Sequence, residues 1–412
     1  MNNNFKTFFR KNSSNGTNSN IPSTMQLMLL HINKKIRSPI TDFMLVSLGV
    51  LLAASSGSWD ITNHLLNKPE TFSSPPHAGL YTGVAIVLLG SIVTLRYFRS
   101  NSNNTKHKDD NYNPMPLAVK LVTIGAIMLV AAGPFDYAWH LAFGLDGLLS
   151  PSHAVLTIGM VLSSIGALLG MLSLSNTPDI YRGSGLDSPA ASSSSMVDSK
   201  NNKRHTISNI LVVIGIVPVW ITISGLTHML SLPFSDTEYF KFNPDPILAA
   251  IIATLAFPFI VSFILCSSFG LTKKFGILSI TGTIFIVVNL TTALLPNKYL
   301  VPTIPFYILN FIPILAMDVL LSSLSAKTKI VNYIAGAVLG VIFFTLYYPL
   351  ITHTYNEVLS NPQSVWPSLT SSIYFGMIGK IYPLIIIPAM TTGILGSIIS
   401  TKLTQLRSRT KI

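Results

Sequence analysis

The sequence has 412 residues, of which 49% are hydrophobic and only 10% are charged, and its mean hydropathy is +0.53. A soluble protein of this length needs far more surface charge, so the composition predicts a protein that crosses a membrane many times. The net charge of +12 does not indicate nucleic-acid binding, because the Lys and Arg residues stand at the ends of apolar runs and form no continuous basic patch. The single cysteine, Cys266, lies inside an apolar run, which excludes a disulfide framework and a thiolate metal cluster.

Residues 1–38 precede the first long apolar run, and their Asn- and Ser-rich start predicts a disordered cytoplasmic N-terminus. From there on, we expect an all-α polytopic integral membrane protein with about ten transmembrane helices, each near the ~20 residues that a bilayer core requires. The expected spans are 39–58, 78–97, 116–136, 153–174, 207–229, 246–268, 275–295, 301–323, 330–352 and 371–398.

A polar segment at 175–206 divides these spans. It is rich in Ser, Asn and Asp, with four consecutive serines at its centre, and it predicts a flexible cytoplasmic linker. The linker would separate a four-helix membrane subdomain, 39–174, from a six-helix membrane subdomain, 207–400. Residues 401–412 are expected to form a basic cytoplasmic tail.

The distribution of basic residues predicts the orientation. The two ends of the chain and the loops on their side of the membrane hold 23 of the 27 Lys and Arg residues, span ends included. The opposite loops hold only Lys68, Lys241 and Lys298. Because cytoplasmic loops carry the excess of basic residues, we expect a multi-pass protein of the cell membrane with both termini in the cytoplasm.

One spacing of polar residues occurs twice within the first four predicted helices. Both copies have the form D-x3-H-x12-H, with no gap between them. They consist of Asp60, His64 and His77, and of Asp136, His140 and His153. Over 24 aligned positions, beginning at Gly57 and at Gly133, nine residues are identical. Repetition in register indicates a duplicated helical hairpin.

Each copy contains ligand types that suit a transition metal. The Asp and the first His are four residues apart, which places them on one helix face, and the second His follows a Pro that begins the next helix. Each hairpin would therefore bring one carboxylate and two imidazoles together near the outer face of the membrane. This set suits copper, zinc or iron and leaves an open coordination position for water or substrate. The structural alternative is that these residues are solvated or cap helices, but the duplication of all three ligand types favours a metal site.

The second copy resembles the metal motif found in one membrane subunit of the membrane-bound copper monooxygenases, the family of particulate methane and ammonia monooxygenases. The shared residues are Asp136, Trp139, His140, Asp146, Pro151, Ser152 and His153. The resemblance implies that Asp136, His140 and His153 bind copper. It implies the same role for Asp60, His64 and His77 as a second set, although Asn63 replaces the Trp in that copy. It also implies other membrane subunits as partners and a possible role as a subunit of a copper-dependent monooxygenase. The family subunit is shorter and carries the motif once.

The alternative function is a transporter for a small solute or a metal ion. Asp318 and Lys380 are ionisable residues inside predicted spans, where they would form either part of a transport path or a structural ion pair. His228 and His353 end the fifth and ninth spans, as His64 and His140 end the first and third. They are either eroded copies of the hairpin histidines or have no role in metal binding.

Overall fold

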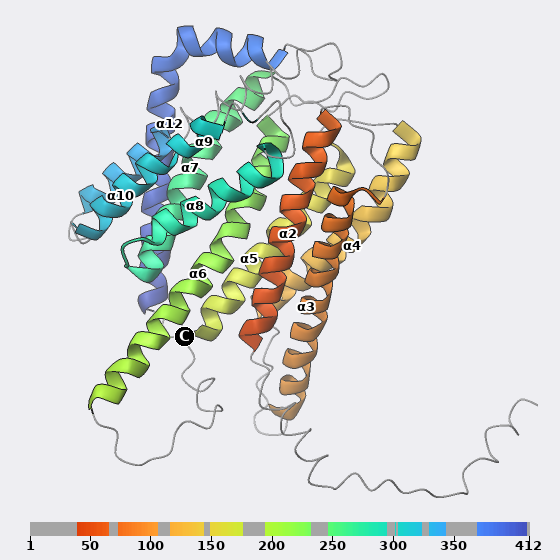
Figure 1. The fold of residues 1–412 in the computed structure, drawn as a ribbon, viewed down its shortest axis with the longest axis vertical. Coiled ribbons are helices and arrows are strands. Elements are labelled where there is room, and N and C mark those ends of the chain that lie inside the picture. Colours follow the sequence, from red (N-terminus) through yellow and green to blue (C-terminus); the bar gives the residue numbers. More distant parts are fainter. Residues whose placement is uncertain are drawn as a thin grey trace, which may run out of the picture. The chain divides into compact units, whose positions relative to one another are not determined.

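A computed structural model describes residues 39–65, 73–105, 116–143, 149–175, 194–231, 246–294, 301, 304–323, 329–342 and 369–409. Throughout these ranges the chain forms α-helices joined by short connections, with one π-helical turn and no strand, which confirms the all-α prediction (Figure 1). The elements are α2 (Pro39–Leu65), α3 (Pro75–Thr105), α4 (Leu117–Phe143), α5 (Pro151–Ser175), α6 (Ser194–Ser231), α7 (Pro246–Thr272), α8 (Ile277–Asn289), η3 (Leu290–Leu294), α9 (Ile304–Leu309), α10 (Phe311–Ser323) and α12 (Leu369–Arg409). A further helix spans Lys329–Ile342.

Seven helices among the described residues are long and apolar enough to cross a membrane. They cover Pro39–Asn63, Pro75–Ser100, Leu117–Phe143, Pro151–Ser175, Ser208–Ser231, Ile251–Thr272 and Ile386–Leu406. The protein is therefore a polytopic membrane protein, and its apolar helices imply contact with the lipid bilayer.

The other three predicted spans coincide with shorter helices. Span 275–295 consists of α8 and the π-helical turn η3, and only Lys329–Ile342 of span 330–352 is described. Span 301–323 is interrupted at Asn310 between α9 and α10. Pro313 explains this break, because its ring would clash with the carbonyl of Leu309 in a continuous helix.

The first four helices form two hairpins that pack against each other. Helix α2 packs on α3 and α4 packs on α5, while α2 contacts α5 and α3 contacts α4. Small residues bring the backbones close: a Cβ on Gly83 would lie 2.5 Å from the Ala53 nitrogen, and one on Gly125 would lie 2.6 Å from the Gly159 carbonyl oxygen. Close approach through small residues is the usual basis of helix packing in membranes. The connected ends of both hairpins, where α2 ends and α3 begins and where α4 ends and α5 begins, lie at the same end of the bundle (Figure 1).

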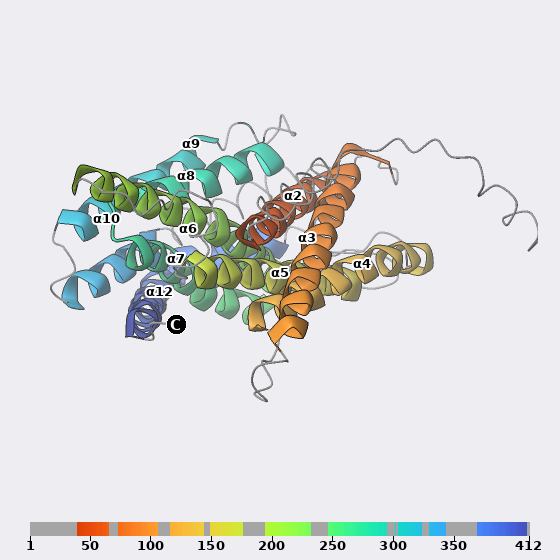
Figure 2. The ribbon, with the colours of Figure 1, turned by 90° about the horizontal axis from the view of Figure 1, so that it is seen from below.

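Helix α6 connects these hairpins to the remaining helices, contacting α2, α5, α7 and α8. Figure 2 shows α2, α3 and α4 toward the right of the view and α10 and α12 toward the left. Buried hydroxyl groups contribute to the contact. Ser47 donates a hydrogen bond to the carbonyl of Ile214 (2.8 Å), and the hydroxyls of Ser164 and Thr222 are 3.1 Å apart. All described residues belong to one compact unit, and α6 begins at Ser194, inside the predicted linker. The division into subdomains stays a prediction.

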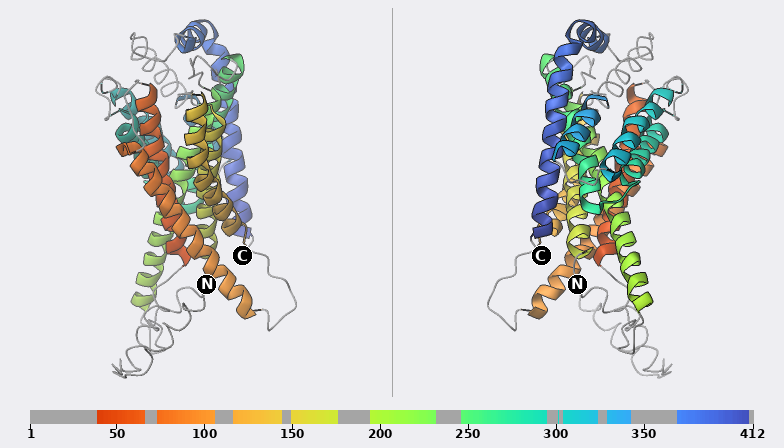
Figure 3. Two further views of the ribbon diagram at one scale, coloured as in Figure 1. Left: turned by 90° about the vertical axis from the view of Figure 1, so that its right-hand side faces the viewer. Right: turned by 90° about the vertical axis from the view of Figure 1, so that its left-hand side faces the viewer.

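Residues of α6, α7, α8, α10 and the helix at 329–342 form one buried cluster that includes Trp220 of α6, which is fully buried and whose ring stacks on Phe285 of α8 at 3.9 Å. Helix α12 runs along α7 (Figure 3), and Gly393 of α12 lies against the backbone of Gly336. Figure 1 shows α12 bent along its length. Pro383 and Pro388 lie within this helix and lack the amide that a straight helix needs, which accounts for a bend.

Asp318 of α10 is fully buried and caps another helix. Its Oδ2 accepts hydrogen bonds from the backbone N–H (2.9 Å) and the hydroxyl (2.7 Å) of Ser279, in the first turn of α8. A carboxylate at this position satisfies a backbone N–H that the helix leaves open and complements the helix dipole. The side chain of Lys380 lies outside the described residues, so its predicted pairing with Asp318 stays untested.

Basic residues near several helix ends indicate how the protein is oriented in the membrane. Arg99 is near the end of α3, Lys120 near the start of α4, Lys273 follows α7, and Lys402 is near the end of α12. These ends lie opposite the connected ends of the two hairpins (Figure 1). This arrangement agrees with a cytoplasmic basic face, and the orientation in the membrane stays a prediction.

Candidate metal centre

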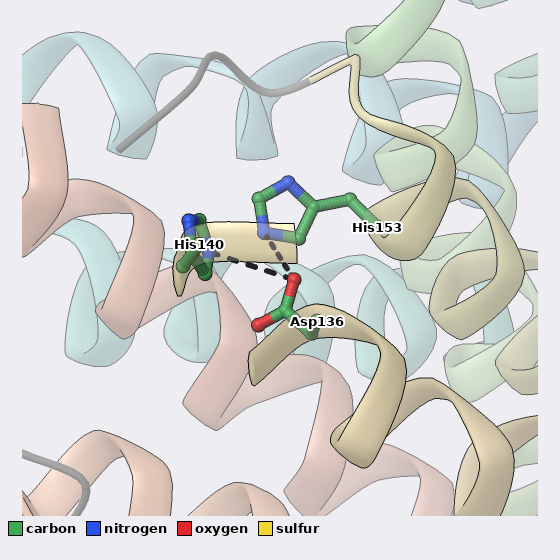
Figure 4. A group of neighbouring side chains, drawn as sticks. All are labelled: Asp136, His140 and His153. Carbon is green, nitrogen blue, oxygen red and sulfur yellow. Dashed lines mark ion pairs between the residues drawn. The ribbon is translucent and has the colours of Figure 1, made fainter. Parts of the chain in front are cut away.

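The α4–α5 hairpin brings together the three residues of the second copy. Asp136 and His140 lie one turn apart near the end of α4, and His153 lies in the first turn of α5. One ligand atom from each residue lies within 4.8 Å of the others. In Figure 4 the rings of His140 and His153 face the carboxylate of Asp136. The convergence predicted from the spacing is therefore present in this hairpin.

The separations of the donor atoms match those around a metal ion better than those of hydrogen bonds. His140 Nε2 is 3.5 Å and His153 Nε2 is 3.4 Å from the same oxygen, Oδ1 of Asp136. Hydrogen bonds between N–H and O are usually about 2.7–3.2 Å long. Ligand atoms bound tetrahedrally to one ion, at bond lengths of about 2.0–2.1 Å, are about 3.3–3.4 Å apart. The side chains are partly buried, with 34% of Asp136, 22% of His140 and 12% of His153 exposed.

Two serines at the start of α5 fix this geometry. Pro151 is the first residue of α5, and the hydroxyl of the preceding Ser150 accepts a hydrogen bond from the backbone N–H of His153 (3.2 Å). This is an N-cap followed by Pro, a favoured helix start. The hydroxyl of Ser152 donates to Asp136 Oδ1 at 2.7 Å and lies 3.1 Å from that of Ser150. Both serines are buried. Neither serine was predicted to support the site, although Ser before Pro is a recognisable capping signal.

The α2–α3 hairpin holds the first copy in a different arrangement. Asp60 is in α2 and His77 in the first turn of α3, with His77 Nε2 2.8 Å from Asp60 Oδ1. This is a close ion-pair contact, shorter than the 3.4 and 3.5 Å separations of the second copy. The backbone of His64 lies in α2, one turn after Asp60, but its side chain is outside the described residues. The structure therefore brings together two of the three predicted ligands of this copy and leaves the third untested.

Tyr81 lies next to the first copy. It follows His77 by one turn of α3, and the centres of the two rings are 6.0 Å apart. Helices α3 and α4 contact each other, so the two hairpins that carry the copies are neighbours. Helical spacing predicts that Tyr81 and His77 share a face, whereas the contact between the hairpins depends on how the helices pack.

His228 is not part of the group formed by Asp136, His140 and His153 among the described residues. It is in the last turn of α6, where its ring packs on Phe257 of α7 at 4.8 Å between ring centres. The acidic residues that follow it in the sequence, Asp236, Glu238 and Asp245, lie outside the described residues, as does His353.

These observations define a class: a polytopic, all-α membrane protein with a possible Asp/His/His metal site in one of its described hairpins. Comparisons with protein families, with curated proteins and with solved structures found no match. The resemblance to the copper monooxygenases therefore rests on the motif from Asp136 to His153 alone.

Proposed function

We propose that the protein is an integral membrane metal-binding protein that holds a transition-metal ion between Asp136, His140 and His153. The observation that carries the proposal is the pair of 3.4 and 3.5 Å separations between the imidazole nitrogens and one carboxylate oxygen. Three ligands leave an open position on a tetrahedral ion. Because Asp136 is one-third exposed, water or a small substrate has access to that position.

Copper is the metal we propose, with zinc and iron as alternatives. Imidazole-rich sites bind copper more tightly than zinc or iron when supply is equal. The resemblance to the copper monooxygenase motif supports the same choice, and on that basis the protein would act with other membrane subunits in an oxidoreductase complex. A bound copper ion would supply one-electron and oxygen chemistry. The chain itself would supply the ligands and the partly buried position.

We further propose that Asp60, His64 and His77 form a second site of the same ligand type, and that both sites face outward. The support is the repeated spacing, the contact between Asp60 and His77, and the position of His64 one helical turn after Asp60. The common location of both hairpin ends would place the sites on one side of the membrane.

The test is elemental analysis of the purified protein after saturation with copper, beside His140→Ala and His64→Ala variants. The proposal expects about two copper ions per chain and a loss of about one in each variant. A wild-type protein that stays metal-free when copper and zinc are supplied would refute it. Loss of both ions in either variant would instead indicate one shared dinuclear site.

A further inference from the structure

The two hairpins share one ligand spacing but differ at the residue before the second histidine. Ser152 precedes His153, whereas Pro76 precedes His77. Ser150 and Ser74 occupy equivalent positions just before the two helices, and each backbone carbonyl accepts a hydrogen bond from the residue four positions on. Among the described residues the Ser74 hydroxyl has no hydrogen-bond partner, whereas that of Ser150 accepts from His153. The second hairpin thus has two engaged hydroxyls beside its ligands, those of Ser150 and Ser152, and the described part of the first hairpin has neither at the equivalent positions.

The carboxylates of the two hairpins also differ in their contacts. Asp136 Oδ1 accepts the Ser152 hydroxyl at 2.7 Å, and the nearest imidazole nitrogens are 3.4 Å or more away. The first hairpin has Pro76 at the position of Ser152, and Asp60 Oδ1 contacts His77 Nε2 directly at 2.8 Å. A metal ion entering the first hairpin must break that contact before it can bind both residues. In the second hairpin the hydroxyl orients the carboxylate and the imidazoles are already at ligand separation.

The Ser152 hydroxyl is not needed to cap its own helix, since Ser150 already accepts the His153 N–H. It is fully buried and extends across the hairpin to α4. Hydrogen bonds to ligating carboxylates orient them, and losing one typically lowers metal affinity on the order of 10–100-fold.

We propose that Ser152 is a positioning residue that makes the second hairpin the tighter of two unequal metal sites, and that Pro76 makes the first hairpin the weaker one. The inference rests on the proposed metal-binding function. It assigns the tight site to Asp136, His140 and His153, which fill first when metal is limiting, and the weak site to the first copy.

The experiment is a titration of the metal-free, full-length protein in detergent with Cu²⁺, against a competing chelator of known affinity. The wild type should show one tight and one weaker site, and His140→Ala should remove the tight one. Ser152→Ala should weaken the tight site on the order of 10–100-fold and leave the weaker site unchanged. The matched control is Ser163→Ala, which makes the same change in α5 at a fully buried hydroxyl that has no hydrogen-bond partner among the described residues. It should bind Cu²⁺ as the wild type does.

Two further measurements separate positioning from a general loss of structure. Pro76→Ser should strengthen the weak site, a gain that damage to the fold would not produce. The electron paramagnetic resonance spectrum of the first Cu²⁺ equivalent should change in Ser152→Ala and stay unchanged in Ser163→Ala. Wild-type sites of equal affinity, or a Ser152→Ala variant with unchanged tight binding and spectrum, would overturn the inference while leaving metal binding intact. Failure of the wild type to bind any Cu²⁺ would overturn the proposed function as well.

Discussion

Replacing Gly125 by Ala should weaken the metal site from a distance, by separating the two helices that carry its ligands. A Cβ at Gly125 would lie 2.6 Å from the carbonyl oxygen of Gly159 and 2.8 Å from the backbone nitrogen of Ser163, both on α5. These are backbone atoms, so α5 must withdraw by about 0.8 Å to restore an ordinary van der Waals contact. Overpacking of this kind costs about 1–3 kcal/mol.

This displacement should change the distances between the ligands, because they come from both helices. Asp136 and His140 are on α4 and His153 is on α5. Metal–ligand distances tolerate deviations of only about 0.2 Å, several times less than the displacement needed at the glycine. We therefore expect Gly125→Ala to lower both the unfolding temperature and the Cu²⁺ affinity of the second hairpin.

The assay is Cu²⁺ content after dialysis against limiting metal, with thermal unfolding of the same samples. Gly133→Ala is the matched control: it lies in the same helix, only three residues from Asp136, and a Cβ there would meet no atom within 4 Å. Since Ala favours helix more than Gly does, this variant should be at least as stable as the wild type and retain its metal. A Gly125→Ala protein that binds Cu²⁺ as tightly as the wild type would refute the reasoning, as would equal losses in both variants.

Two further predictions concern topology and the second half of the chain. In a Cys266→Ala background, a cysteine at Lys68 should react with an impermeant thiol reagent in intact cells and one at Ser193 should not; the reverse pattern would show that the predicted orientation is wrong. Asp318→Ala removes the acceptor of two hydrogen bonds from Ser279 and should lower the unfolding free energy by about 1–3 kcal/mol, while copper content stays at the wild-type value. Loss of copper from a folded Asp318→Ala protein would favour the transporter alternative.

Much of the membrane architecture follows from local sequence patterns. A long apolar run must form a helix in a bilayer, because no water is present to satisfy an exposed backbone. The seven long helices were therefore predictable from hydropathy, and their start at prolines such as Pro39, Pro75 and Pro151 from capping rules. The convergence of Asp136, His140 and His153 was predictable for a similar reason. Helical periodicity aligns the first two residues, and Pro151 fixes where the helix that carries the third begins.

Local patterns predicted the structure less reliably where helix packing or a helix break determines it. The apolar character of 301–323 predicted one span, whereas Pro313 and Asn310 divide it into two short helices. Asp318 was predicted to belong either to a transport path or to an ion pair with Lys380, and no local pattern indicated that it caps α8, an element 39 residues away. Hydropathy records neither the clash of a proline ring nor the proximity of a distant helix end.

The difference between the two hairpins was visible in the sequence only as Ser152 against Pro76. Its meaning depends on distances across each hairpin: Ser152 reaches Asp136, sixteen residues back, because α4 and α5 approach closely at Gly125 and Gly159. The same D-x3-H-x12-H spacing thus accommodates a close contact between Asp60 and His77 in one hairpin and an open triad in the other. Spacing along the chain determines which side chains can meet. The packing of the helices determines their separations to within an ångström, and a metal site depends on those separations.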